Sequence, residues 1–262
     1  MYIMYSNYQS FVSNIKDELF NFKSNGVYNH ILEHVSFEQG KQYIYFIQKT
    51  IKEKSLGVDF KSINDYLLLN DKYGSPLKYE YNYNDEKIIC SPTSLRYILH
   101  ALLILLHIKS VNLTKIVEVG CGYGGLFLAI NHFSKILSIS IDKYYIVDLP
   151  EVGSLIQNYI KKLENNIDIP YSIHLAYDYG IDILDENLFF ISNYCFTEIE
   201  ELHRNNYINI LFPKISNGFI IWQTIFNLPI NNIDMIGKNI INLEVEYPQT
   251  ANEIDKNYYV YF

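Results

Sequence analysis

The feature that most constrains the fold of this chain is the glycine-rich run E-V-G-C-G-Y-G-G at positions 118–125. It lies between a short strand-like apolar segment, residues 116–119, and a helix-like apolar segment, residues 126–133. Glycines at the carboxyl end of a strand permit positive φ and let a ligand come close to the backbone. The free amides and the positive dipole end of the following helix point to the same place. The run therefore predicts a strand–turn–helix unit that binds a small polar or anionic ligand.

The segments after residue 115 alternate between strand-like and helix-like patterns. The expected strands are residues 116–119, 145–147, 171–175, 188–192, 219–222, 240–247 and 258–262. The expected helices are residues 126–133, 152–163 and 197–211. Strands separated by helices imply right-handed crossovers and a parallel sheet, and the last two strands should form a hairpin across the turn-rich residues 248–257. The sequence predicts an α/β fold: a Rossmann-like seven-stranded, mostly parallel sheet with an antiparallel C-terminal hairpin.

The first part of the chain has helical patterns instead. Apolar residues recur at spacings of three and four in two sets: Phe11, Ile15, Leu19 and Phe22, and, after a break at Gly40, Tyr43, Ile44, Ile47 and Ile51. Residues 71–85 are rich in polar residues, with a glycine and a proline, and are expected to form a loop. Ser91 as N-cap and Pro92 at the first helical position open an apolar helix that should be buried. We therefore predict a helical N-terminal segment, residues 1–110, covering the mouth of the site, and a second domain, residues 111–262.

Charge and composition narrow the range of partners. The net charge is −8 and lysine and arginine form no cluster, so nucleic acid is not an expected partner. The longest apolar stretch, residues 99–108, is shorter than the roughly 20 residues that span a membrane, and residues 1–10 lack a secretory pattern. Three widely spaced cysteines predict neither a disulfide framework nor a zinc site and fit a cytoplasmic location. His30 and His34 have metal-ligand spacing but no evident third ligand, so no metal is expected.

An acidic residue at a strand end is the second candidate for ligand binding. Asp148 follows the strand at 145–147, and its two carboxylate oxygens can accept hydrogen bonds from both hydroxyls of a ribose. Asp142 is the rival acid, but it precedes that strand and so lies at the wrong end. The glycine spacing also satisfies the dinucleotide pattern G-x-G-x-x-G. A nicotinamide site requires no acid at position 118, and a C-terminal hairpin leaves no second mononucleotide-binding half, so a dinucleotide is the less favoured ligand.

The glycine run, E-x-G-x-G-x-G, resembles motif I of class I methyltransferases, which bind S-adenosylmethionine. Most of the chain is similar to the family of sugar O-methyltransferases. Besides the glycine run, the similarity rests on L-N-D-K-Y-G-S-P at 69–76, S-P-T-S-L-R-Y at 91–97, V-D-L-P-E at 147–151 and S-N-Y-C-F-T-E at 192–198. Where this chain has Cys121, the family commonly has glycine, a small change that should not block the loop.

The resemblance implies a set of cofactor contacts. The loop would wrap the methionine part of S-adenosylmethionine, Asp148 would take the ribose, and Asp178 would accept from the adenine amino group. Arg96 would pair with the cofactor carboxylate, a bidentate role that suits guanidinium. A solvated loop acid at Asp178 and a surface ion pair at Arg96 remain alternatives. The implied cofactor-binding residues are Arg96, Glu118, Gly120, Cys121, Gly122, Tyr123, Gly124, Asp148, Leu149 and Asp178.

Methyl transfer to a hydroxyl also requires a base that removes the hydroxyl proton. The base should lie just beyond the carboxyl end of the fourth strand, where Glu198 fits best by its place in the family motif, with Asn193 as an orienting partner. His203 is a further candidate because histidine titrates near neutral pH, but it lies about a helical turn farther along. Glu198 could instead belong to a solvated first turn of the helix at 197–211.

The expected function is S-adenosylmethionine-dependent transfer of a methyl group to a sugar hydroxyl, in a glycan or a nucleotide sugar. The expected partner is a small-molecule sugar or glycan acceptor, and the sequence leaves a homo-oligomer open. Three alternatives remain: an N- or O-methyltransferase of another small metabolite, a non-catalytic cofactor-binding protein of the same fold, and a nicotinamide-dependent oxidoreductase.

Overall fold

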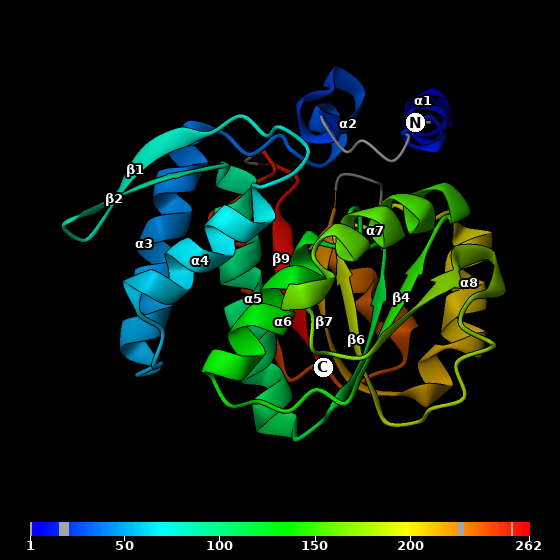
Figure 1. Ribbon diagram of the computed structural model, residues 1–262. Helices are drawn as coiled ribbons and strands as arrows, with labels where there is room; N and C mark the ends of the chain where they lie inside the picture. The colour runs from blue at the N-terminus through cyan, green and yellow to red at the C-terminus, as the bar shows by residue number, and fades with distance from the viewer. Residues whose placement is uncertain (1, 16–20, 225–227, 253) are drawn as a thin grey trace. The chain divides into compact units, whose positions relative to one another are not determined.

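The computed structural model describes residues 2–15, 21–224, 228–252 and 254–262 (Figure 1). The chain forms two compact units. The sheet unit comprises Leu106–Cys121, Ser140–Gly153 and Ile169–Phe262, and the helical unit comprises Met1–Leu105, Gly122–Ile139 and Ser154–Asp168. One of the places where the chain passes between the two units lies within the glycine run, after Cys121. The predicted domains, residues 1–110 and 111–262, stay a prediction.

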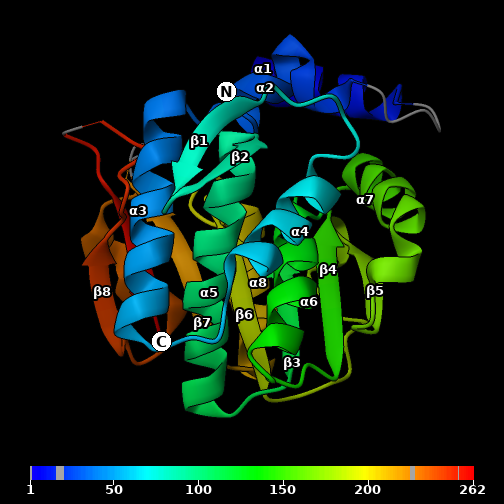
Figure 2. The same ribbon diagram turned by 60° about the vertical axis from the view of Figure 1, so that its left-hand side comes forward.

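The sheet unit is built on a seven-stranded sheet in the order β5-β4-β3-β6-β7-β9-β8, with β5 and β8 at its edges (Figure 2). The strands are β3 (Lys115–Val119), β4 (Lys143–Asp148), β5 (Tyr171–Leu175), β6 (Leu188–Asn193), β7 (Ile215–Gln223), β8 (Asn242–Val245) and β9 (Asn257–Tyr261). Neighbouring strands from β5 to β7 pair in parallel, and β9 is antiparallel to both β7 and β8. The predicted α/β fold, with a mostly parallel sheet and an antiparallel C-terminal hairpin, is confirmed.

The order of the strands reverses between β3 and β6. From β3 the chain proceeds through β4 to the edge strand β5 and then forms β6 on the other side of β3. These four strands together with β7 follow the order 3-2-1-4-5 of Rossmann-like sheets. In such sheets ligands bind outside the carboxyl ends of the strands at the reversal. The residues that follow β3, β4 and β6 are therefore where a ligand site is expected.

The strands form because apolar side chains fill them on both faces. In β3, Ile116, Val117 and Val119 are buried, as expected of a central parallel strand. One apolar cluster of the sheet unit includes Phe212 and Trp222, which are at most 2% exposed. Burying a side chain of this kind stabilises the fold by about 1.5–3 kcal/mol. The cluster fixes β6 and β7 and hence the residues at their carboxyl ends.

One helix of the sheet unit starts later than predicted. The helix expected at 197–211 is α8, Glu201–Ile210. Glu200 is extended, with φ −56° and ψ 146°, and before it Glu198 N donates to Cys195 O at 2.9 Å. Residues 195–199 therefore form a turn. The described 3₁₀ segments of this unit are η3 (Ala176–Asp178), η4 (Phe212–Lys214) and η5 (Ile230–Ile236), and the sequence predicted none of them.

The helical unit contains most of the predicted helices. Its elements are α1 (Tyr2–Ser13), η1 (Phe22–Ser24), α2 (Gly26–Ile31), α3 (Phe37–Glu53), α4 (Phe60–Asn70), β1 (Tyr79–Tyr83), β2 (Glu86–Cys90), α6 (Gly125–Ile136), η2 (Glu164–Asn166) and parts of α5 (Pro92–Val111) and α7 (Pro150–Lys162). The helices predicted at 126–133 and 152–163 are confirmed as α6 and α7. In the first predicted set, α1 ends at Ser13, so Ile15 lies outside it, and Leu19 lies outside the described residues.

Gly40 does not break a helix, contrary to the prediction. Helix α3 begins at Phe37, behind a capping box formed by Ser36 and Gln39, and continues through Gly40. A Cβ at this position would lie 2.6 Å from Tyr81 Cζ. Glycine is needed here for close packing of α3 against the strand that carries Tyr81, and helix propensity alone could not reveal this.

The segment predicted as a loop, residues 71–85, contains a strand. β1 pairs with β2 in an antiparallel hairpin (Figure 1), and Asn84 in its turn has φ +53°. Tyr81 and Tyr83 are buried, whereas Glu80 and Asn82 between and beside them are exposed. This alternation of tyrosine with polar residues is the period of a half-buried strand and outweighs the polar composition.

Helix α5 is the apolar helix predicted after residue 91, and it is confirmed. Ser91 Oγ accepts a hydrogen bond from Thr93 N at 3.3 Å, as an N-cap does. Among the described residues, α5 is the one helix whose length and hydropathy would allow it to cross a membrane, and 72% of its apolar window is buried. Burial of this kind is typical of a core helix.

Candidate functional site

The glycine turn after β3 adopts the conformation that its sequence predicts. Gly120, Gly122 and Gly124 have φ of +83°, +62° and +90°, in the left-handed region that favours glycine. At Gly120 a second constraint applies, because an added Cβ would overlap Cβ and Sγ of Cys195. The turn after β3 therefore packs closely against the residues that follow β6.

Asp148 fixes the first half of this turn. Its Oδ2 accepts a hydrogen bond from Cys121 N at 2.7 Å, and its Oδ1 accepts one from Leu149 N at 2.8 Å. Gly120 N also donates to Val147 O at 3.0 Å. Asp142 lies at the other end of β4, where it accepts from Thr114 Oγ1 at 2.7 Å. Of the two acids, Asp148 is the one at the carboxyl edge with the glycine turn.

Glu118 lies inside the sheet unit and not at its surface. It is 2% exposed, and its Oε2 accepts a hydrogen bond from the Tyr144 hydroxyl at 2.6 Å. Burial raises the pKa of Glu118 to about 7. A carboxylate in this environment supports β3 and β4 beneath the turn, and the sequence alone gave no sign of its partner.

The residues after β6 are tied to the end of β3. Ser192 Oγ donates to Val119 O at 2.9 Å and accepts from Phe196 N at 3.0 Å. Ser192 is fully buried, so both bonds are shielded from water. Its hydroxyl thus joins two strands at the point where the strand order reverses and fixes the start of the turn that carries Glu198.

Glu198, the predicted base, lies in that turn. With its amide nitrogen turned toward the carboxylate, Gln223 donates to Glu198 Oε1 at 2.9 Å and also to the carbonyl of Tyr194. Burial raises the pKa of Glu198 to about 8, although the bond from Gln223 opposes the rise. The alternative that Glu198 belongs to the first turn of a helix is wrong, because α8 begins at Glu201. Asn193, its predicted partner, is the last residue of β6.

The turn after β5 holds Asp178, and helix α8 holds His203. Asp178 is exposed in η3, and Tyr179 beside it has φ +51°. The Tyr179 hydroxyl lies 2.7 Å from His203 Nδ1, and their rings stack with centroids 5.9 Å apart. Tyr207, also from α8, donates to Ala176 O at 2.9 Å. His203 therefore contacts the turn that bears Asp178, whereas the described contacts of Glu198 are with other residues.

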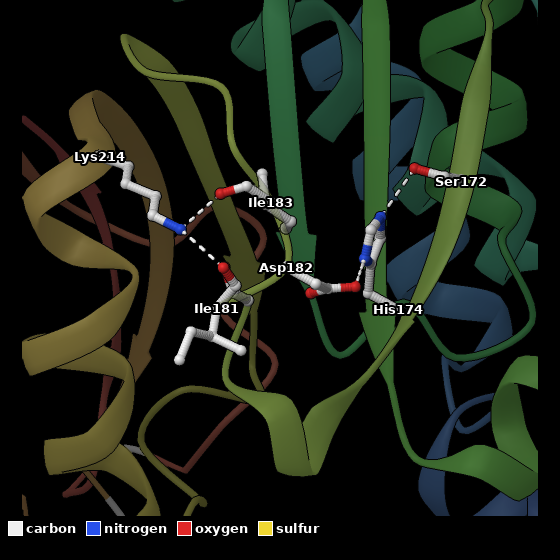
Figure 3. A network of polar contacts seen from close by, with 7 residues as sticks. Ser172, His174, Ile181, Asp182, Ile183 and Lys214 are labelled. Atoms are coloured by element: carbon white, nitrogen blue, oxygen red, sulfur yellow. Dashed lines mark hydrogen bonds and ion pairs between the residues drawn. The ribbon is translucent and has the colours of Figure 1, made fainter.

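A polar network holds the connection between β5 and β6 (Figure 3). Ser172 Oγ lies 2.8 Å from His174 Nε2, and His174 Nδ1 lies 2.5 Å from Asp182 Oδ2. Lys214 Nζ donates to the carbonyl of Gly180 at 3.0 Å and to that of Ile183. Serine, histidine and aspartate also form hydrolase triads in this order. Here serine and histidine are two residues apart on one edge strand, and the network anchors the connection that carries Asp178.

The remaining predicted residues belong to the helical unit. Arg96 is 3% exposed, and its Nη2 donates to Leu32 O at 2.8 Å. Tyr123 is fully buried, and its hydroxyl lies 3.0 Å from Asn70 Nδ2. The side chain of Tyr123 is therefore part of the core of that unit, and only its backbone remains a candidate for ligand contact. Leu32 lies near Gly122, with its Cδ1 3.1 Å from the position of an added Cβ.

Sequence reasoning missed Gln223, Tyr179 and Ser192 as partners of the predicted residues. Gln223 could have been found, because it is the first polar residue after the apolar run of β7 and so lies at the carboxyl edge of the sheet. The other two are set by tertiary contacts. Within the described ranges, no group of three or more histidine, cysteine, aspartate or glutamate residues is arranged to hold a metal ion.

Comparison with known proteins gives solved structures only. No protein-family model and no curated protein matches the chain. An S-adenosylmethionine-dependent methyltransferase from Clostridium acetobutylicum ATCC 824 is similar at 10% identity and a TM-score of 0.46, over 84% of this chain and 97% of that one. The methyltransferase domain of bacterial CtHen1-CN is similar at 13% identity and a TM-score of 0.46, over 62% of this chain and 96% of that one. Magnesium protoporphyrin IX methyltransferase from Synechocystis PCC 6803, solved with bound SAM, is similar at 11% identity and a TM-score of 0.42, over 64% of this chain and 82% of that one.

Proposed function

We propose that this chain is an S-adenosylmethionine-dependent methyltransferase. The observation that carries the proposal is the glycine turn at the strand reversal, where the amide of Cys121 is fixed by the carboxylate of Asp148 at 2.7 Å. Gly120 has no room for a side chain because Cys195 fills that space, so the turn lies directly against the loop after β6. A Rossmann-like sheet places its ligand at this point.

The residues of the sheet unit suit a nucleoside with a sulfonium group. Asp148 lies at the carboxyl edge beside the glycine turn, where its two oxygens accept the amides of Cys121 and Leu149, and its carboxylate is assigned to the two ribose hydroxyls. The backbone of Gly120 and Cys121 is assigned to the methionine part, and Asp178, which is exposed after β5, to the adenine amino group. When bound, S-adenosylmethionine supplies a methyl group that is activated for displacement.

Glu198 is assigned as the base that takes the proton of the acceptor hydroxyl. Its carboxylate follows β6, and burial raises its pKa to about 8, which makes it a stronger base than an ordinary glutamate. Gln223 donates to one carboxylate oxygen, so the other can receive the proton. Proton removal by a placed base contributes about 10²–10⁴-fold in rate. His203 is the second candidate: it lies on α8, farther along the chain from β6, where its ring stacks on Tyr179 of the turn after β5.

The acceptor is proposed to be a sugar hydroxyl, in a glycan or a nucleotide sugar, on the basis of the sequence resemblance. A methyl-donor assay read by mass spectrometry, across nucleotide sugars, free sugars and non-sugar metabolites, tests this. If only a non-sugar metabolite is methylated, the proposed sugar acceptor is wrong, whereas the proposal that the protein is a methyltransferase stands.

Calorimetric titration with S-adenosylmethionine and with NAD tests the class of ligand. The wild type should bind S-adenosylmethionine and not NAD. Asp148→Ala should weaken that binding at least about tenfold, since each hydrogen bond to a charged group contributes about 1.5–3 kcal/mol. Asp142→Ala removes the same group at the far end of β4 and should leave affinity unchanged. Binding of NAD in preference would refute the proposal.

A further inference from the structure

Glu246 is a buried carboxylate that has no place in the proposed chemistry so far. It directly follows β8 and is 2% exposed. Its Oε2 accepts from Thr250 N at 2.9 Å, from Thr250 Oγ1 at 2.7 Å and from Asn257 Nδ2 at 3.0 Å. Its Oε1 accepts from the hydroxyl of Tyr194. Four donors thus replace the water that a buried carboxylate loses, and one of them comes from the loop after β6.

Tyr194, the donor from that loop, has an uncommon backbone conformation. Its φ of +65° is strained for a bulky residue and persists only where the surroundings hold it. Three contacts do so. Its hydroxyl is bound by Glu246, its amide donates to Ile221 O at 3.3 Å, and its carbonyl accepts from Gln223. Tyr194 thus fixes the path of the chain between β6 and Glu198, four residues later.

Besides this first branch of contacts through Tyr194, a second branch connects Glu246 with Glu198 through the paired strands of the sheet. Asn257 is the residue opposite Gln223 in the antiparallel pair β7–β9, so their side chains lie next to each other on one face. Asn257 is bound to Glu246, and Gln223 is bound to Glu198. Both branches therefore begin at Glu246 and end at the carboxylate assigned as the base.

We propose that Glu246 is a positioning residue that sets the place and surroundings of Glu198 through Tyr194 and Gln223. This inference rests on the proposed function, in which Glu198 is the base. Glu246 itself is enclosed by its four donors, and the proposed function assigns it no contact with cofactor or acceptor. Its role is to keep the loop after β6 in a conformation that the chain would otherwise leave, because the left-handed φ of Tyr194 is unfavourable.

Titration of Glu198 tests the inference without any need for turnover. In protein labelled with ¹³C-glutamate, the Glu198 carboxyl signal is identified by its loss in Glu198→Gln. The wild-type signal should titrate with a pKa of about 8. In Glu246→Gln the loop should loosen and admit water, so the pKa of Glu198 should fall toward the ordinary value for glutamate. Tyr194→Phe removes only the hydroxyl that Glu246 binds and should act in the same direction.

Glu244→Gln is the matched control, because it makes the same change two residues away on β8, where the side chain is partly exposed. It should leave the Glu198 titration at the wild-type value. In methyl transfer, Glu246→Gln should lower kcat by about 10- to 100-fold with cofactor affinity unchanged, as expected for a misplaced base. If Glu246→Gln does not fold, Tyr194→Phe decides.

The two proposals can fail separately. A wild-type Glu198 titration that stays the same in both Glu246→Gln and Tyr194→Phe overturns the positioning role, whatever the enzyme does. If Glu198 shifts as expected but the protein binds no S-adenosylmethionine, the positioning contact stands and the proposed function fails.

Discussion

Gly120→Ala tests the turn on which the proposed cofactor site depends, and its cost can be worked from two structural terms. The backbone term comes from φ +83°, a left-handed conformation that costs an L residue roughly 1–2 kcal/mol. The packing term comes from the overlap of the new Cβ with Cβ and Sγ of Cys195, and overpacking of this kind costs about 1–3 kcal/mol. Together the free energy of unfolding should fall by about 2–5 kcal/mol.

Gly237→Ala separates the two terms. Gly237 has φ +61°, and an added Cβ there would have no atom within 4 Å, so only the backbone term applies. Urea denaturation followed by circular dichroism should give a loss of about 1–2 kcal/mol for this variant. The difference between the two variants then measures the contact with Cys195, and Cys195→Ala in the Gly120→Ala background should recover part of it. An equal loss at Gly120 and Gly237 would refute the close approach of the two loops.

Three further predictions concern buried titratable groups. Glu198 is ionised above its raised pKa of about 8, so kcat/KM for methyl transfer should rise with pH up to about 8. Glu198→Gln should abolish this rise. A wild-type pH profile that is flat below pH 8 would exclude Glu198 as the base. Burial raises the pKa of Glu118 from 4.5 to about 7, so the folded state binds this proton more tightly than the unfolded state does. The free energy of unfolding should therefore fall by about 3 kcal/mol as pH rises from 4.5 to about 7. In urea denaturation, Glu118→Gln, which keeps an acceptor for Tyr144, should remove that slope, and an unchanged slope would contradict the assignment. Burial lowers the pKa of Lys23 from 10.5 to about 8, so the free energy of unfolding should increase as pH rises from about 8 to 10.5. Lys23→Met should not show this increase. The same pH dependence in both proteins would count against a buried ammonium at Lys23.

Local pattern was sufficient for the sheet and for the positions of two candidate residues, Asp148 and Glu198, at the ends of its strands. Apolar runs of strand length, separated by helical segments, predicted all seven strands of the sheet, and the turn residues before β9 predicted its hairpin. Asp148 was found because a strand end is a local feature, and the parallel arrangement then brings it to the same edge as the glycine turn. The same reasoning placed Glu198 after β6.

The sequence pattern could not predict contacts between residues that only the tertiary fold brings together. The sequence predicts a helix break at Gly40 because nothing local indicates that Tyr81 packs against it. The binding of Tyr194 by Glu246 depends on two residues 52 positions apart. The pairing of Gln223 with Asn257 depends on the register of β7 and β9, which a one-residue slip would change completely.

The two carboxylates of the proposed mechanism differ in the way their roles require. Asp148 is bound through both oxygens by rigid backbone amides, so its position is fixed by the chain itself, as suits a group that only holds a ligand. Glu198 is bound by one flexible side-chain amide in surroundings that raise its pKa to about 8, as suits a group that must take up and release a proton. A backbone anchor can come from neighbouring residues, whereas a side-chain anchor needs its own support. The contacts of Glu246 supply that support, which explains why this carboxylate, to which the proposed mechanism assigns no bond with cofactor or acceptor, is buried among four donors.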